Sequence, residues 1–143
     1  MTVSAVSLAA ADLAALARAA EETFPDEACA ILEGTVTGTV VQVERVHLAP
    51  NVAADRRLAF EVDPRVLLRL HRELRGTPRD IVGVWHSHPD GNATPSATDF
   101  ARTYDPSLAW IITGVTGAGA TASRAFRVDS VAFAEVALTE RRS

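Results

Sequence analysis

The stretch DIVGVWHSHPDG, residues 80–91, sets the architecture that the rest of the chain must fit. Its first half is short and almost entirely apolar, which is typical of a strand buried on both faces of a sheet. This strand leads directly into His86 and His88. Because strand side chains alternate between faces, residues two apart point to the same side, so the two imidazoles can converge on one ion.

Helical and extended patterns alternate on both sides of this strand. Apolar residues recur at helical spacing from Leu13 to Phe24, where Pro25 ends the pattern. Asp63-Pro64 predicts the start of a second helix, as N-cap and first helical position, and this helix is expected to end at Gly76.

The remaining segments complete an α/β (α+β) pattern, a mixed sheet covered by helices. The segment 113–123 is expected to be a flexible connection, and a third helix is expected to begin near Pro95-Ser96. A hairpin is expected around Gly34 to Gly38. Strands are expected at 2–6, 28–34, 39–48, 58–64, 108–114, 122–128 and 131–138.

Length and composition favour one domain, residues 1–143, in the cytoplasm. The one cysteine, Cys29, cannot form an internal disulfide, and no signal segment is evident, which favours a reducing compartment. No apolar run reaches the roughly 18 residues that a membrane span needs. The net charge of -4, from 18 acidic and 14 basic residues, argues against a phosphate backbone as the main partner. We therefore expect neither a membrane nor a nucleic-acid partner.

A serine and an aspartate follow the histidine pair. Ser96 and Asp99 are three residues apart at the start of the expected third helix, so their side chains share a face. The intervening loop, rich in turn residues, can fold that helix end back over His86 and His88. Two imidazoles and one carboxylate form a three-ligand site of the kind found at catalytic zinc, whereas structural zinc usually takes four ligands, mostly cysteine.

Hydrolysis at such a site also needs a carboxylate that moves protons. No second histidine lies at helical spacing from either member of the pair, so the HExxH motif is absent and the base must come from elsewhere. Glu27, between the helix-ending Pro25 and an apolar strand, is our candidate. Its neighbour Asp26 is the physical competitor, and Glu27 could instead serve as a surface cap or ion-pair partner.

Simpler roles are available for several of these residues. The segment from Ser96 to Asp99 is also an acidic variant of a capping box, which needs no metal. That interpretation does not explain the two upstream histidines, and both roles can hold together. Cys29 is expected to be a small buried hydrophobe rather than a nucleophile, and Trp85 and Trp110 are expected to be core residues.

With these residues placed, the sequence resembles the JAMM (MPN-plus) metalloproteases. Their signature is an upstream glutamate, then His-x-His, seven residues, a serine, two residues and an aspartate, and residues 86–99 match this spacing at every position. The segment PDEACAILEG, residues 25–34, resembles the one that carries the family's glutamate, with Ala30 where glycine is common. Residues 50–64 are similar to the family's middle section, so the resemblance covers nearly the whole chain.

The resemblance implies a fold, a cofactor and a set of roles. The implied fold is the MPN/JAMM fold, a curved mixed β-sheet flanked by helices, with a cytidine-deaminase-like shape. One Zn²⁺ per chain would be held by His86, His88 and Asp99. Glu27 would act as general base and then as general acid, and Ser96 would donate a hydrogen bond to the oxyanion of the tetrahedral intermediate.

The resemblance also implies a zinc-dependent metallopeptidase or isopeptidase-like hydrolase. The chain has little room for the insertions with which larger members grip ubiquitin chains, so it resembles minimal prokaryotic forms. Such forms resemble enzymes that release groups attached after the C-terminal Gly-Gly of small ubiquitin-like or sulfur-carrier proteins, and cleavage of an amide bond after such a Gly-Gly is the activity that this resemblance implies. Arg56 and Arg57 are either solvated loop charges or contacts for an acidic carrier.

Two other functional classes can be compared with this hydrolase. A non-catalytic MPN-like protein-binding scaffold is the alternative, and the complete set of site residues counts against it. A zinc deaminase is close to excluded, because the chain has neither His-x-Glu nor Pro-Cys-x-x-Cys. The sequence leaves the oligomeric state open, with a homodimer among the options.

Overall fold

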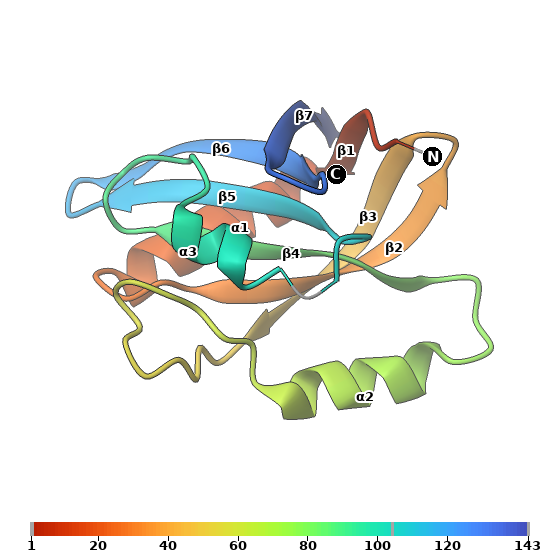
Figure 1. The fold of residues 1–143 in the computed structure, drawn as a ribbon, viewed down its shortest axis with the longest axis horizontal. Coiled ribbons are helices and arrows are strands. Elements are labelled where there is room, and N and C mark those ends of the chain that lie inside the picture. Colours follow the sequence, from red (N-terminus) through yellow and green to blue (C-terminus); the bar gives the residue numbers. More distant parts are fainter. Residues whose placement is uncertain (1, 104, 143) are drawn as a thin grey trace.

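A single closed sheet organises the computed structural model, which describes residues 2–103 and 105–142 (Figure 1). In these residues the strands follow the order β1-β3-β2-β4-β5-β6-β7, and β1 also pairs with β7. The strands are β1 (Ala5–Ala9), β2 (Cys29–Thr37), β3 (Val40–Ala49), β4 (Asp80–His88), β5 (Ala109–Thr116), β6 (Gly119–Val128) and β7 (Phe133–Arg141). The helices are α1 (Ala10–Thr23), α2 (Pro64–Leu74) and α3 (Ala97–Ala101).

The sheet is mixed, as predicted. β4 lies between β2 and β5, antiparallel to β2 and parallel to β5. β1 is parallel to both of its neighbours, β3 and β7. The closure between β1 and β7 is a feature that the strand patterns did not predict, because local periodicity does not specify which edge strands pair.

The two faces of β4 pack into two different hydrophobic cores. Trp85 is fully buried in a cluster with Leu16 of α1, which lies behind the sheet in Figure 1. Val84 belongs to a second cluster on the opposite face, which includes Leu70 of α2. Because His86 is two residues beyond Val84, it emerges on the face that carries α2.

The second helix begins and ends as predicted. Pro64 occupies the first turn, and the carboxylate of Asp63 accepts a hydrogen bond from the backbone N–H of Arg65 at 3.0 Å. Gly76 follows the helix with φ of 79°, a left-handed conformation that glycine adopts without steric cost. The cap at one end and the glycine at the other therefore define this helix, as the sequence indicated.

The strand expected over 28–34 is longer than predicted. β2 continues through Gly34 to Thr37, and the hairpin turn lies at Gly38, whose φ is 63°. Gly34 lies next to a register shift in the pairing with β3, where a Cβ atom would collide with the backbone carbonyl of Gln42. Glycine at this position thus marks a close approach of two backbones rather than the end of a strand.

Two further expectations about connections are wrong. Residues 58–64 do not form a strand, and only an isolated bridge joins Asn51 to Val62. The supposed flexible connection over 113–123 consists largely of paired residues of β5 and β6, joined by a short turn. In both cases long-range hydrogen bonding, which local composition does not report, decides the conformation.

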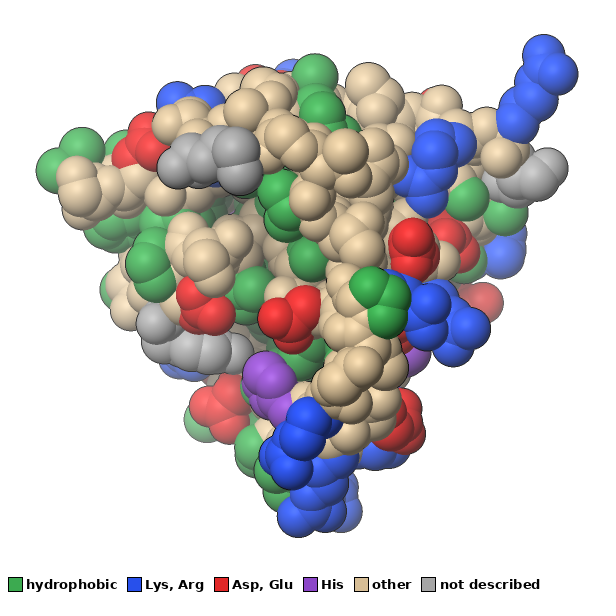
Figure 2. Space-filling view, turned by 90° about the vertical axis from the view of Figure 1, so that its right-hand side faces the viewer, with side chains coloured by type: hydrophobic (Ala, Val, Ile, Leu, Met, Phe, Trp, Pro, Cys, Tyr) green, Lys and Arg blue, Asp and Glu red, His purple; other side chains and the backbone are tan. Residues whose placement is uncertain are grey.

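Figure 2 shows charged side chains of both signs dispersed over one face of the molecule. On the face shown in Figure 2, arginines gather at the lower end, where α2 lies. None of the helices in the described part of the chain is long and apolar enough to cross a membrane.

Candidate metal and catalytic site

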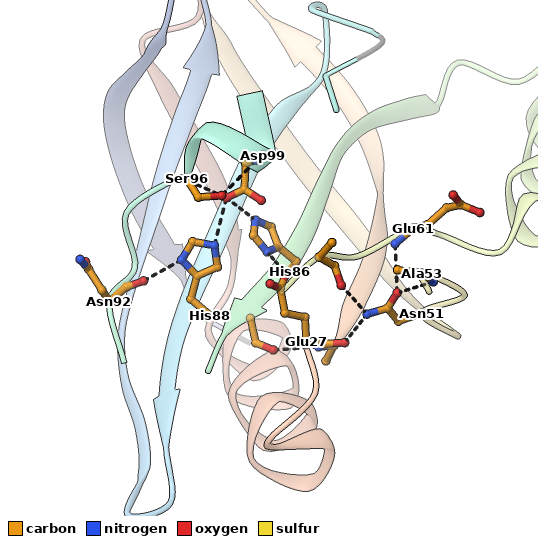
Figure 3. Close-up of polar contacts among 12 residues, drawn as sticks. Glu27, Asn51, Ala53, Glu61, His86, His88, Asn92, Ser96 and Asp99 are labelled. Atoms are coloured by element: carbon orange, nitrogen blue, oxygen red, sulfur yellow. Dashed lines mark hydrogen bonds and ion pairs between the residues drawn. The ribbon is translucent and has the colours of Figure 1, made fainter. Parts of the chain in front are cut away.

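Four buried side chains from separate parts of the chain meet at one end of β4. His86 and His88 come from the end of this strand, Asp99 from the first turn of α3, and Glu27 from the segment that leads into β2. One ligand atom from each of the four lies within 4.8 Å of the others (Figure 3). The structure thus brings together the three expected metal ligands and the expected general base.

His88 is held on both ring nitrogens. Its Nδ1 donates to the backbone carbonyl of Asn92 at 2.9 Å, and its Nε2 lies 3.0 Å from Oδ2 of Asp99. Burial alone would lower the pKa of His88, but the hydrogen bond and charge of Asp99 outweigh it and raise that pKa. Because the carbonyl occupies Nδ1, the nitrogen that faces the cluster is Nε2.

Asp99 lies between the two imidazoles. Burial tends to raise the pKa of the Asp99 carboxyl, but the hydrogen bond with His88 and the charge of His86 outweigh it and lower the pKa. Its Oδ2 also accepts from the backbone N–H of Ser96 at 2.9 Å, which fixes the carboxylate at the start of α3. The carboxylate is therefore ionised and held in place by the polypeptide itself.

His86 carries the atom that argues most directly for an ion. Its Nδ1 lies 3.1 Å from Oε1 of Glu27, whereas its Nε2, 3.6 Å from Asp99 Oδ2, is buried without a hydrogen-bond partner. No other buried side-chain nitrogen or oxygen in the described residues is left in this way. Since buried polar groups are nearly always paired, this orphaned nitrogen fits the role of a metal ligand.

The donor set is consistent with a divalent transition metal. Two imidazole nitrogens and a carboxylate oxygen are ligands that zinc accepts in catalytic sites, where one further position is kept for water or substrate. In addition, both histidines use Nδ1 for a contact with an oxygen acceptor, the usual arrangement around metal-bound imidazole. The residues present therefore fit the group that the sequence implied.

Ser96 takes the structural role that the sequence left open. Its Oγ accepts from the backbone N–H of Asp99 at 3.0 Å, and together with the reciprocal bond this forms a complete capping box. The bond uses the hydroxyl oxygen as an acceptor, so the hydroxyl hydrogen stays free to donate from this exposed position. A cap and an oxyanion donor are therefore compatible in one residue.

Asp26, the alternative candidate for the general base, points away from the cluster. Asp26 pairs with the exposed Arg56 at 3.3 Å, outside the cluster.

Cys29 is buried near the backbone carbonyl of Ala49, and burial together with the nearby Glu27 raises the pKa of its thiol to about 12. The thiol therefore stays protonated at neutral pH, as expected for a small buried hydrophobe rather than a nucleophile.

Sequence reasoning missed three residues that support the site. Phe60 stacks on the His86 ring with centroids 4.4 Å apart, and Trp110, expected only in the core, packs edge-on against the same ring. Ser87 is fully buried on the opposite face and accepts from the backbone N–H of Ala28 at 2.8 Å. Because strand side chains alternate between faces, the position of Ser87 between His86 and His88 already indicated that it points away from them.

Known proteins share sequence similarity with most of this chain. Residues 9–129 match the family described as prokaryotic homologues of the JAB domain. The chain belongs to this family. It is 36% identical over 116 residues to a desampylase from Haloferax volcanii, covering 78% of this chain and 82% of that protein. A shorter match, 38% identical over 58 residues, links this JAB-family chain to a probable TtuB-protein conjugate cleaving protease from Thermus thermophilus, and covers 41% and 39% of the two proteins.

Solved structures resemble this JAB-family chain over almost its full length. A protein from Desulfitobacterium hafniense is 27% identical with a TM-score of 0.84, covering 96% of this chain and 94% of that one. A protein from Salinibacter ruber is also 27% identical, with a TM-score of 0.72 and coverage of 94% and 91%. The expected MPN/JAMM architecture, a curved sheet with flanking helices, is thereby confirmed.

Proposed function

We propose that this chain is a zinc-dependent, isopeptidase-like hydrolase that acts as one domain, residues 1–143, in the cytoplasm. Its substrate is an amide bond formed after the C-terminal Gly-Gly of a small ubiquitin-like or sulfur-carrier protein. The observation that carries the proposal is the buried cluster of Glu27, His86, His88 and Asp99 with its orphaned imidazole nitrogen. The substrate class is supported by two relatives, a desampylase and a probable TtuB-protein conjugate cleaving protease.

The residues divide the chemistry between them. His86, His88 and Asp99 would hold Zn²⁺, which supplies a Lewis acid for the scissile carbonyl and the attacking water. Glu27 takes a proton from that water and returns it to the leaving amine. Ser96, whose hydroxyl hydrogen is free, donates to the carbonyl oxygen as negative charge develops there.

A neighbouring cavity supports an extended substrate tail. Its volume is about 320 Å³, and its walls include Phe60 and Trp110, the two rings that also contact His86. Because Phe60 and Trp110 separate this cavity from the His86 ring, a tail that occupies the cavity would lie directly beside the cluster. Glycines at the end of such a tail would let its backbone approach the cluster without a side-chain clash.

A cleavage assay tests this proposal. The zinc-loaded protein is incubated with a ubiquitin-like carrier joined through its Gly-Gly terminus to a lysine side chain, and the released carrier is identified by mass. We expect release by the wild type and none by Glu27→Gln or His88→Ala. Binding of the carrier without cleavage of any Gly-Gly adduct would favour the alternative, a non-catalytic MPN-like scaffold.

A further inference from the structure

The side chain of Asn51 uses all of its hydrogen-bonding capacity next to the site. Its Nδ2 donates to the backbone carbonyls of Glu27 at 2.9 Å and Ala59 at 3.0 Å. Its Oδ1 accepts from the backbone N–H groups of Ala53 and Glu61, both at 3.0 Å (Figure 3). An amide offers two donor hydrogens and two acceptor lone pairs, so this one side chain is fully satisfied.

These bonds matter because Glu27 lies outside the sheet. β2 begins at Cys29, so the backbone of Glu27 has no strand partner. Its carbonyl accepts from Asn51, and its N–H donates to the backbone carbonyl of Arg56 at 2.6 Å. Both backbone polar groups of the proposed general base are thus held by residues of the loop 50–63, and by none of the residues in β4.

The same loop reaches the other side of the cluster. Asn51 accepts from Glu61 and donates to Ala59, the two neighbours of Phe60 in the chain. Phe60 in turn stacks on His86, whose Nδ1 contacts the Glu27 carboxylate. One amide side chain therefore ties the backbone of the base to the ring that packs against its histidine partner.

We propose that Asn51 is a positioning residue that fixes Glu27 for proton transfer. This inference rests on the hydrolytic function proposed above. Proton transfer requires the carboxylate within hydrogen-bond reach of the attacking water, and a displacement of about 1 Å can cost on the order of 100-fold in rate. Among the described residues, the four side-chain hydrogen bonds of Asn51 include none to His86, His88 or Asp99, so its loss should act on catalysis and not on the metal.

Substitutions separate the donating half of the amide from the accepting half. Asn51→Asp keeps an oxygen for Ala53 and Glu61 but removes both donors, including the one to Glu27. Asn51→Ala removes all four bonds. We expect both variants to lose about 10- to 100-fold in kcat, with KM changed by less than about twofold and zinc content unchanged.

A matched control comes from the same loop. The Asp55 side chain accepts from the backbone N–H of Arg57 at 3.2 Å and forms no hydrogen bond with Glu27. Asp55→Ala therefore removes a side-chain bond of the same loop while the four bonds of Asn51 keep their partners, and we expect its kcat to stay within about twofold of the wild type. A loss equal to that of Asn51→Ala would overturn the proposal, because general loop disorder would then explain both.

The coupling to Glu27 is tested by combining variants. If Asn51 acts through Glu27, Asn51→Ala in a Glu27→Gln background should lower the residual rate by less than about threefold, because strongly coupled residues are non-additive. A full multiplicative loss would contradict the inference. Where the residual rate is too small to measure, amide hydrogen exchange decides between the two outcomes.

The exchange experiment needs no catalysis. In Asn51→Ala we expect faster exchange not only at Ala53 and Glu61, which lose their acceptor, but also at Glu27, whose own N–H bond is to Arg56. Unchanged exchange at Glu27 would show a purely local role and overturn the proposal. If Asn51→Ala fails to fold, Asn51→Asp serves in its place, and faster exchange is then expected at Glu27 while Ala53 and Glu61 keep their acceptor.

The two proposals fail in distinguishable ways. A wild-type protein that cleaves no Gly-Gly adduct overturns the proposed function, and with it the catalytic role of Asn51. A wild type that cleaves, alongside an Asn51→Ala variant with the same kcat, overturns only the role of Asn51.

Discussion

Nε2 of His86 lies 3.6 Å from Oδ2 of Asp99, a separation too long for a hydrogen bond but suited to two ligands of one ion. Ligands at about 2.0–2.2 Å from a tetrahedral zinc are separated by roughly 3.3–3.6 Å. The contact between His88 Nε2 and the same oxygen, at 3.0 Å, needs only a small adjustment to reach this range. The polypeptide therefore holds the ligand atoms close to the spacing that metal binding requires.

Metal content provides the first prediction. We expect about one zinc per chain in the wild type, and loss of the metal in His88→Ala and Asp99→Ala, because two remaining ligands bind weakly. Zinc is quantified after purification without a histidine tag. His71, exposed on α2, supplies the control: His71→Ala should retain the metal, and loss there would show that the assay reports general damage.

Ser96 provides a prediction in which two roles can be separated. Ser96→Ala removes both the cap acceptor and the proposed oxyanion donor, so we expect a loss of about 1 kcal/mol in the free energy of unfolding. We also expect a loss on the order of 100- to 1,000-fold in kcat. Ser96→Thr keeps a hydroxyl and should recover most of both losses. If Ser96→Ala lowers the free energy of unfolding but leaves kcat unchanged, Ser96 acts only as the helix cap and not as an oxyanion donor.

Ser87 should support the site through packing rather than chemistry. Its Oγ is the acceptor for the buried N–H of Ala28, next to Glu27, so Ser87→Ala leaves that donor unpaired. We expect a decrease of about 1–3 kcal/mol in the free energy of unfolding, measured with urea. Zinc content should not change, because the side chain points away from His86 and His88. Wild-type stability in this variant would mean that the bond contributes little.

The sequence predicted the features that depend on contacts between residues close together in the chain, and it missed those that depend on distant residues. The spacing from His86 to Asp99 predicted the cluster because a strand and a helix start each impose a local periodicity on their side chains. The local pattern predicts a strand over residues 58–64, in the second half of the loop 50–63, because their apolar residues carry the same signal as β4. The conformation of this loop depends on Asn51, whose four partners lie up to 24 residues away in the chain, and no local pattern reports such bonds.

The ion network around Glu33, remote from the cluster, should make stability depend on pH. Glu33 is almost fully buried, and it accepts from His47 at 2.8 Å and from Arg79 at 2.6 Å. Burial alone would raise the pKa of Glu33, but these two partners outweigh it and lower the pKa below its ordinary value of 4.5. A carboxyl with a lowered folded-state pKa stabilises the protein above that ordinary value, and this contribution is lost as the pH falls through the folded-state pKa.

Glu33→Gln should therefore be less stable than the wild type at neutral pH, by about 1–3 kcal/mol, because it leaves Arg79 without its buried partner. Urea unfolding of the metal-free proteins measures the difference, and the titration of the site histidines cancels because both proteins contain them. The difference should shrink as the pH falls below about 4.5, since protonated Glu33 resembles glutamine. Glu44, half exposed and 3.7 Å from Arg79, is the matched control, and Glu44→Gln should change stability by less than about 0.5 kcal/mol. A Glu33→Gln deficit that stays constant down to about pH 3 would mean that packing, not charge, makes Glu33 stabilising.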